Sequence, residues 1–260
     1  MCIVNFNIFA ACFFCSSISR CVLNTLHRNG SNLTKTLRIY LGHKLTCTTI
    51  YFDHLFWAVA NKLTINMCKT KELVFHRPNA RNDLAPSELP GIERILCAQL
   101  LGVWLQNYFS MRKHVDYIMH ICNQRSYLLT QLKRQGLPMA QLQSVVDAIV
   151  LSRVLYAAPA WRGYLSAGEM ASLQQLFAKA KRWKIVASNY DIDVLLDNCD
   201  RTFFRSSLYI TLCLHHLFPD KRDHTHAMTL RPRGNNYSLP RFKFLHARNS
   251  FINRSLYKYV

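Results

Sequence analysis

Four aspartates between residues 190 and 200 form the densest group of side chains able to hold a metal ion. Asp191 and Asp193 alternate within Tyr-Asp-Ile-Asp, and Asp197 and Asp200 follow. Alternate residues of a strand share one face, so two of these carboxylates could bind magnesium. An acidic turn at the start of a helix explains the same residues equally well, because carboxylates stabilise a helix N-terminus. The spacing alone leaves both interpretations open.

A second group of potential metal ligands follows, in the pattern Cys213-x-His215-His216…His224-x-His226. Zinc is one interpretation, since cysteine and histidine are its usual ligands. A zinc knuckle is dominated by cysteine, however, and only Cys199 joins Cys213 nearby, so surface and helix-end histidines are the competing interpretation. The chain shows no Ser-His-Asp order, phosphate-binding glycine loop or dinucleotide fingerprint. We therefore predict no bound metal and no small-molecule ligand.

The charge balance points to polyanionic partners. The chain of 260 residues has 33 Lys and Arg against 14 Asp and Glu, a formal net charge of +19 and a pI near 9.8. Such an excess favours nucleic acid first and acidic lipid surfaces second. A basic protein with no role in nucleic-acid binding remains the alternative.

The cysteines and the N-terminus bear on the compartment. The ten cysteines fall largely in apolar runs, which is typical of buried free thiols in a reducing compartment. The apolar run in residues 1–21 is broken by Asn5 and Asn7 and has no positively charged start, which differs from a standard signal peptide. No other segment is expected to be long and apolar enough to span a bilayer. We expect an intracellular chain, nuclear or cytoplasmic, without a membrane partner; a non-standard signal peptide is the alternative.

The first part of the chain is expected to hold little helix. Residues 1–50 show no clean periodicity, which predicts a poorly structured leader. A short helix over 52–62 and a strand over 72–77 are expected to follow, then a polar loop with prolines. The apolar run 94–106 contains Gly102 and predicts a β-hairpin.

Helices dominate the second part. Apolar residues at three- and four-residue steps predict a helix over 114–134 that Gly136 ends, and Pro138 starts a second helix. Ser166 and Glu169 form a capping box at the start of a third helix. Another helix is expected at about 201–218, before a basic, aromatic tail. The predicted class is therefore α+β and mostly helical. The expected stripes are Val115, Ile118, Cys122, Leu129 and Leu132, then Leu142, Val145, Val146, Ile149 and Val150, then Leu173, Leu176, Phe177 and Ala180.

Four stretches, taken in order, resemble the later part of the reverse transcriptase of non-LTR, LINE-like retrotransposons related to jockey. The first runs from Trp57 to Phe75 and resembles the palm segment after the catalytic strand. Leu100-Leu101-Gly102-Val103 is similar to the turn of the primer-grip hairpin. Tyr156-x-x-Pro-Ala-Trp before Leu-Gln-Gln-Leu resembles the thumb, and Arg-Pro-Arg…Ser-Phe-x-x-Arg resembles the family's closing segment. The match covers residues 52–260.

This resemblance implies a domain order and a set of contacts. A partial palm with its primer-grip hairpin would occupy 51–110, a helical thumb 111–188, and a helical and basic tail 189–260. Lys69 would lie near the triphosphate as a charge stabiliser, although a solvated loop lysine is the alternative. Leu101, Gly102 and Val103 would form the primer-grip-like turn. An RNA template with a DNA primer, or an RNA–DNA duplex, would contact Lys69, Lys71, Lys133, Arg134, Lys181, Arg182, Lys184, Arg231, Arg233 and Arg241.

The chain departs from the family at the catalytic centre. Polymerase chemistry uses two metal ions roughly 4 Å apart, held by carboxylates of two palm strands. Those carboxylates should precede Trp57, where Asp53 is the single acidic residue. We therefore predict an inactive fragment with no cofactor of its own, whereas the intact parent would use Mg²⁺. A transposon-derived relic with no selected activity, and a secreted or membrane-associated basic protein, are the alternatives.

Overall fold

The computed structural model forms two compact units, one within Ser16–Ser110 (the sheet unit) and one within Met111–Val260 (the helical unit). The structure describes the backbone of 18–28, 31–41, 64–65 and His216, and side chains as well for residues 60, 70–75, 88, 90–212, 214, 215, 217–221, 237–239, 241–242 and 245–260. The helix predicted over 52–62 and most of the loop over 77–91 lie outside the described residues.

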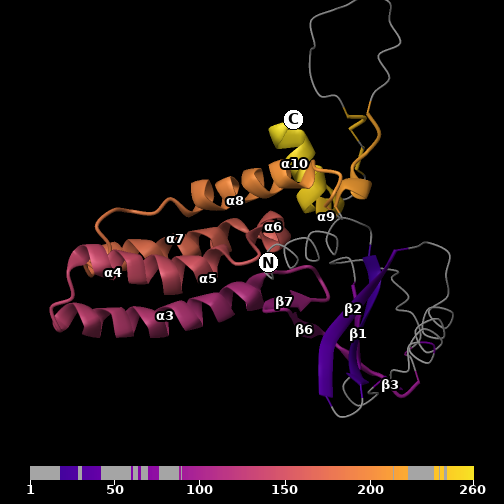
Figure 1. The fold of residues 1–260 in the computed structure, drawn as a ribbon, viewed down its shortest axis with the longest axis horizontal. Helices are drawn as coiled ribbons and strands as arrows, with labels where there is room; N and C mark the ends of the chain where they lie inside the picture. The colour runs from indigo at the N-terminus through magenta and orange to yellow at the C-terminus, as the bar shows by residue number, and fades with distance from the viewer. Residues whose placement is uncertain are drawn as a thin grey trace, which may run out of the picture. The chain divides into compact units, whose positions relative to one another are not determined.

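The sheet unit is built on two strands within residues 1–50, where a poorly structured leader was predicted; for these strands the prediction is wrong. They pair antiparallel with each other, and the first also pairs antiparallel with β3 and β4. β5 adds to β4 in parallel. The order is β2-β1-β4-β5, with β3 beside β1 (Figure 1). The bounds are β1 Ile18–Arg28, β2 Ser31–Leu41, β3 Thr64–Ile65, β4 Lys71–Val74 and β5 Glu93–Ile95.

The predicted β-hairpin is confirmed. β6 (Cys97–Leu100) and β7 (Val103–Gln106) pair antiparallel across the two-residue turn Leu101-Gly102. Both turn residues have positive φ, 47° and 91°, as type I′ turns require. Glycine adopts this conformation freely, but a leucine does so at a cost.

The helical unit confirms three predicted helices and their order. α3 spans Arg112–Arg134, α4 Met139–Val146 and α7 Ala167–Arg182. Of the predicted stripes, all but Leu132, Val145 and Ile149 are buried. The Ser166 hydroxyl accepts from the Glu169 N–H at 3.3 Å and the Glu169 carboxylate accepts from the Ser166 N–H at 2.7 Å, which is the predicted capping box.

The second helix changes its winding partway along. After α4 it becomes π-helical over η2 (Asp147–Leu151) and then α-helical again in α5 (Ser152–Leu155). Leu142, Val146, Val150 and Val154 are all buried. Steps of four residues drift round a helix with 3.6 residues per turn, and the wider π turn offsets this drift.

The same region corrects the membrane expectation. Within the described residues, Met139–Tyr164 is long and apolar enough to cross a bilayer by length and composition. The expectation that no such segment follows the N-terminus is therefore wrong. Part of this segment is buried inside the helical unit, including Leu142, Val146, Val150 and Val154.

The fourth predicted helix lies earlier than expected. α8 spans Ile192–Ser207, and Asp191 is its N-cap, whose carboxylate accepts from the Val194 N–H at 3.2 Å. The acidic helix-start interpretation of Asp191 is thereby confirmed. The remaining elements are α6 (Ala158–Trp161), η3 (Arg162–Tyr164), η4 (His215–Leu217), α9 (Leu245–Asn249) and α10 (Phe251–Tyr259). Figure 1 shows α8 returning alongside α7.

Two arginines, one in η3 and one in α10, both bind a buried carboxylate of α8. Asp200, only 1% exposed, accepts from Arg254 Nη2 at 2.8 Å and from Arg162 Nη1 at 3.1 Å. Arg254 also donates to the carbonyls of Pro159 and Asn249, at 2.8 and 3.0 Å. Because these bonds join residues far apart in sequence, we call Arg162, Arg254 and their aspartate partners the arginine–aspartate network.

The same network engages the aspartates that were candidate metal ligands. Asp193 and Asp197 both accept from Arg162, at 2.7 and 3.0 Å. Burial alone would raise the pKa of Asp197, but hydrogen bonds from Lys258, Tyr259 and Arg162 hold it well below its usual range. These carboxylates therefore serve as counterions for arginine.

The close approach at Gly163 predicts a steric effect on stability. A Cβ there would lie 2.6 Å from Arg254 Nη1 and closer still to the Asn249 carbonyl oxygen. Since the guanidinium is fixed by Asp200, Gly163→Ala should lower the free energy of unfolding by roughly 1–3 kcal/mol, measured by urea titration. Gly168→Ala is the matched control, because nothing lies within 4 Å of its Cβ. The control should be neutral or up to about 1 kcal/mol stabilising; an equal loss in both variants would contradict the steric account.

His114 predicts a pH dependence of stability. It is buried against the edge of Trp161, with ring centroids 5.1 Å apart. Burial, and then the charge of Arg153, lower its pKa from 6.5 to about 3. Between these pH values the unfolded chain binds a proton that the folded chain does not, so stability should fall as pH decreases. The contribution is up to about 1.4 kcal/mol per pH unit. Urea titrations at pH 7, 5.5 and 4.5 should show a shallower loss for His114→Gln than for the wild type; parallel losses would refute the assignment.

Candidate nucleic-acid interface

The C-terminal ends of α3 and α7 lie side by side in the helical unit (Figure 1). Lys133, in the last turn of α3, donates from Nζ to the Trp183 carbonyl at 2.8 Å. Trp183 is the C-cap of α7. Two cationic stretches that lie about 50 residues apart in sequence are therefore brought together.

Both helices end in the same backbone arrangement, a Schellman motif. In α3 the N–H groups of Gly136 and Leu137 donate to Lys133 and Leu132 carbonyls, at 3.0 and 3.2 Å. In α7 the N–H groups of Lys184 and Ile185 donate to Lys181 and Ala180 carbonyls, at 2.8 and 2.9 Å. This motif needs a left-handed residue after the C-cap, usually glycine. Gly136 has φ +89°, whereas Lys184 adopts φ 54° with a side chain.

Six cations gather at these two ends, and we call them the basic cluster. Lys133 and Lys179 are half-buried, and the other four are exposed. Within the described part of the chain, those four exposed side chains make no ion pair, so their charge is directed at solvent. The cluster consists of Lys133, Arg134, Lys179, Lys181, Arg182 and Lys184.

Helix electrostatics account for part of this cluster. A helix C-terminus carries partial negative charge, and cations in the last turn stabilise it. Lys133, bonded to a terminal carbonyl, acts in this way. α7 is also polarised, with Glu169 in its first turn and three cations in its last. Six cations are more than two helix C-termini require for stabilisation. The four exposed cations therefore form a positive surface that suits phosphate groups.

The other predicted contact residues are not brought to this cluster. Lys71 belongs to the sheet unit, where it forms an ion pair with Glu93. Arg241 is exposed and precedes α9. Lys69, Arg231 and Arg233 lie outside the described residues. Of the predicted nucleic-acid contacts, five lie together at the ends of α3 and α7. The structure places Lys71 and Arg241 elsewhere and does not describe the other three.

The primer-grip-like turn has one exposed member. Leu101 is 43% exposed at the tip of the β6–β7 hairpin, whereas Val103 is buried. In the tail, Phe251 is fully buried and packs with Phe203 and other apolar side chains. Phe251 of the aromatic tail therefore belongs to the core of the helical unit.

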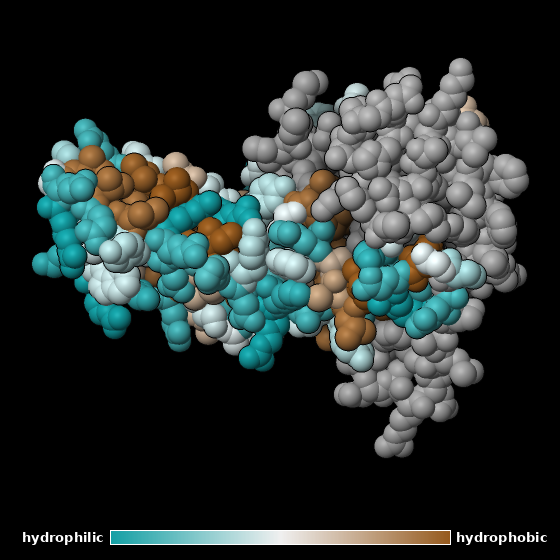
Figure 2. All heavy atoms as spheres, turned by 90° about the horizontal axis from the view of Figure 1, so that it is seen from below, coloured by the Kyte–Doolittle hydropathy of each residue, from teal (hydrophilic) through white to brown (hydrophobic). Residues whose placement is uncertain are grey.

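Sequence reasoning missed one residue of this surface, Trp183. The Lys179 ammonium lies 4.5 Å from the centroid of the Trp183 ring. The signal was present in the sequence, since Trp183 is the aromatic residue inside the basic run Lys-Arg-Trp-Lys. Figure 2 shows one face of the helical unit, on which apolar side chains lie among hydrophilic ones. Tyr127 and Leu128 of α3 are exposed.

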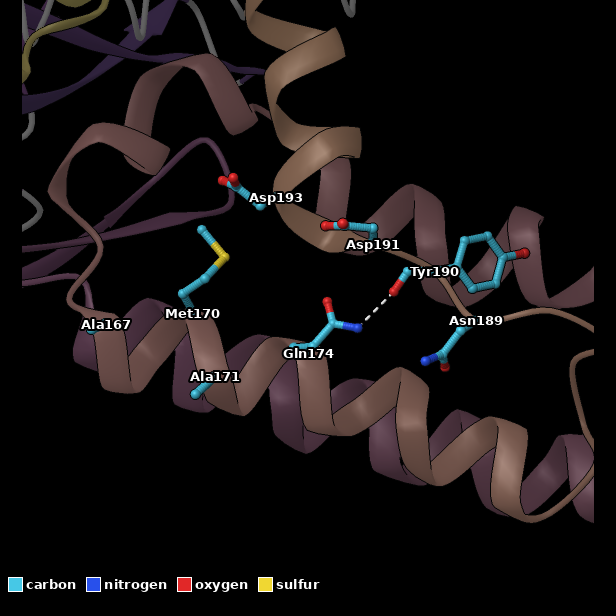
Figure 3. A pocket seen from close by; sticks show the side chains of 8 residues that line it. All are labelled: Ala167, Met170, Ala171, Gln174, Asn189, Tyr190, Asp191 and Asp193. Carbon is cyan, nitrogen blue, oxygen red and sulfur yellow. Dashed lines mark hydrogen bonds between the residues drawn. The ribbon is translucent and has the colours of Figure 1, made fainter.

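An open pocket of about 560 Å³ lies near the other end of α7 (Figure 3). Several of its polar groups have partners: the Gln174 amide donates to the Tyr190 carbonyl at 2.7 Å and accepts from the Ile192 N–H at 3.0 Å. Asp191 caps α8, and Asp193 binds Arg162. The pocket therefore shows no unused catalytic group. Its lining is Ala167, Met170, Ala171, Gln174, Asn189, Tyr190, Asp191 and Asp193.

Metal chemistry has no support among the described residues, which contain no group of three or more His, Cys, Asp or Glu placed to hold an ion. The second candidate group falls largely outside them. Cys213, His224 and His226 are not described, and His215 lies near the Phe218 ring. The zinc interpretation of that group stays a prediction.

The geometry thus defines an α+β, mostly helical chain with a cationic surface where two helices end. Comparison of the chain with protein-family models, with curated proteins and with solved structures found no match.

Lys184 predicts a conflict between stability and binding. A side chain in the left-handed conformation costs roughly 1–2 kcal/mol, so Lys184→Gly should raise the free energy of unfolding by about 1 kcal/mol. The same change removes an exposed cation and should weaken binding of a fluorescein-labelled RNA–DNA duplex, measured by anisotropy. Urea titration measures the first effect.

The matched control is Gly136→Ala, at the same backbone position of α3 and with nothing within 4 Å of its Cβ. It should lose about 1 kcal/mol of stability and leave binding unchanged. If Lys184→Gly were less stable than the wild type, the strain argument would be wrong.

Proposed function

We propose that the chain binds nucleic acid through the basic cluster and is a catalytically inactive relative of the later part of a LINE-type reverse transcriptase. One observation carries the binding: four exposed cations without ion pairs, within the described residues, converge where α3 and α7 end. Phosphates are the partners that such a surface attracts most strongly, and their binding releases counterions.

The fixed backbone favours a defined site over diffuse attraction. Lys133 ties the end of α3 to that of α7, and both Schellman motifs fix the direction in which each helix ends. The cationic side chains therefore project from a rigid base. The phosphates of a nucleic-acid backbone are the same for every base sequence, so binding should tolerate any base sequence.

Contacts within the helical unit support the proposed ancestry. The Trp161 indole donates to the Tyr156 carbonyl at 2.9 Å, and Arg254 donates to the Pro159 carbonyl at 2.8 Å. These residues belong to the two last stretches on which the resemblance rests. These hydrogen bonds give a physical reason for the residue types found in the two stretches. The second stretch, Leu100–Val103, forms the turn of the β6–β7 hairpin, as the resemblance implies.

The proposed inactivity concerns residues 1–260 and is supported by their carboxylates. The family's metal-binding carboxylates should precede Trp57, and Asp53 is the single acidic residue there. The aspartates at 193, 197 and 200 are not substitutes, because each binds Arg162. We propose template and primer, or an RNA–DNA duplex, as ligands, with nucleotide transfer absent.

Removing two cations of the cluster tests the function. Lys181→Ala with Arg182→Ala should weaken binding to a 20-bp RNA–DNA duplex and lower the slope of log affinity against log salt by about 2, one unit per lost phosphate contact. Fluorescence anisotropy from 50 to 300 mM NaCl measures both quantities.

The control variant is Arg205→Ala with Arg248→Ala, which removes two exposed cations near the opposite end of the helical unit (Figure 1). It should change the slope far less. An affinity that does not depend on salt, or equal losses in both double variants, would contradict a site at the basic cluster.

A further inference from the structure

Trp183 stands in the middle of the basic cluster with its position fixed. Its N–H donates to the Lys179 carbonyl at 3.0 Å, and its own carbonyl accepts from Lys133 at 2.8 Å. The residue as a whole is 38% exposed. Two backbone hydrogen bonds thus hold a large aromatic ring at the surface.

The exposure of this ring is unusual among the tryptophans of the described residues. Trp161 is fully buried in the core, and Trp104 is half-buried. The cation–π contact with Lys179 explains how a charged side chain covers part of Trp183. It leaves the exposed part of the ring available, next to the exposed cations Lys181, Arg182 and Lys184.

A ring surrounded by cations is the combination with which proteins bind unpaired nucleotides. The ring stacks on a base, which every base permits, and the cations bind the adjoining phosphates. An intact duplex offers phosphates to the same cations but keeps its bases stacked on one another. The ring therefore adds affinity only where a base is free.

We propose that an unpaired base stacks on Trp183 while the basic cluster binds the flanking phosphates, so that the preferred ligand is single-stranded nucleic acid or a duplex with an unpaired end. This inference rests on the proposed function for the phosphate contacts. It adds a residue and a ligand form that the phosphate contacts alone do not specify.

The test compares two ligands and uses the full chain. Trp183→Ala and Trp183→Phe are titrated by anisotropy with a fluorescein-labelled 12-nucleotide oligothymidine and with a blunt DNA hairpin whose loop is a hexaethylene glycol linker, so that it contains no unpaired base. Trp183→Ala should weaken oligothymidine binding roughly 5- to 100-fold, the loss expected for one base–aromatic stack. Trp183→Phe should retain part of that affinity, and hairpin binding should change less than twofold in both.

The control for a general loss of exposed aromatic surface is Tyr209→Ala, since Tyr209 is 69% exposed after α8. It should bind both ligands as the wild type does. In the wild type, unlabelled oligothymidine should also quench tryptophan emission, and Trp183→Phe should abolish that quenching. This readout keeps the test valid even if Trp183→Ala fails to fold.

The outcomes separate the two proposals. If both Trp183 variants bind oligothymidine normally while Lys181→Ala with Arg182→Ala does not, the stacking is refuted and the phosphate site stands. Equal losses on the hairpin and on oligothymidine in Trp183→Ala would also refute stacking. If neither the tryptophan nor the cation variants change binding of either ligand, both proposals fail.

Discussion

The helical unit depends on one buried negative charge, Asp200. A carboxylate that is 1% exposed is tolerable only when cations replace its water, and Arg162 and Arg254 do so. Removing one partner of such a group typically costs about 3–5 kcal/mol, because the other charge stays buried. The bonds of Arg254 to Asp200 and to the Pro159 carbonyl fix α10 against α6 and α8. The same network engages the acidic face of α8 at one end of the unit, while the cations where α3 and α7 end keep no acidic partner within the described residues.

Local signals in the sequence were sufficient to predict much of the helical unit. The capping box, the glycine after α3 and the apolar stripes each act within one helix, so their positions were predictable. The start of α8 was not: aspartates are poor helix formers, and the run was interpreted as a turn. Arg162, which lies about 30 residues earlier, pairs with Asp193 and Asp197, and these partners cannot be read from the local sequence. β1 and β2 were missed because residues 1–50 show no clean periodicity, although the two strands are neighbours in sequence and pair with each other. Only β1 also pairs with β4, and that contact is long-range.

The candidate site, too, was predictable from the sequence only in part. The run of cations at the end of α7 was visible in the sequence, because charge needs no fold to be counted. Its meeting with Lys133 was not, since it requires α3 and α7 to pack side by side. Trp183 was missed because an aromatic residue near a helix end is normally expected in the core. Only its 38% exposure and the ammonium of Lys179 over its ring distinguish it from Trp161.

Backbone strain gives an independent reason to connect the exposed tips with function. Among the described residues other than glycine, four have positive φ: Leu101, Phe109, Ala157 and Lys184. Packing explains two of them, because Phe109 stacks on Phe75 at 4.5 Å and Ala157 is buried. Leu101 and Lys184 are exposed, and glycine would serve the backbone better at each. α3 demonstrates this, since it ends in the same motif with Gly136. A side chain retained at a strained, exposed position contributes little to the fold, so its contribution is better sought in what it contacts. For Lys184 we propose that this contact is phosphate.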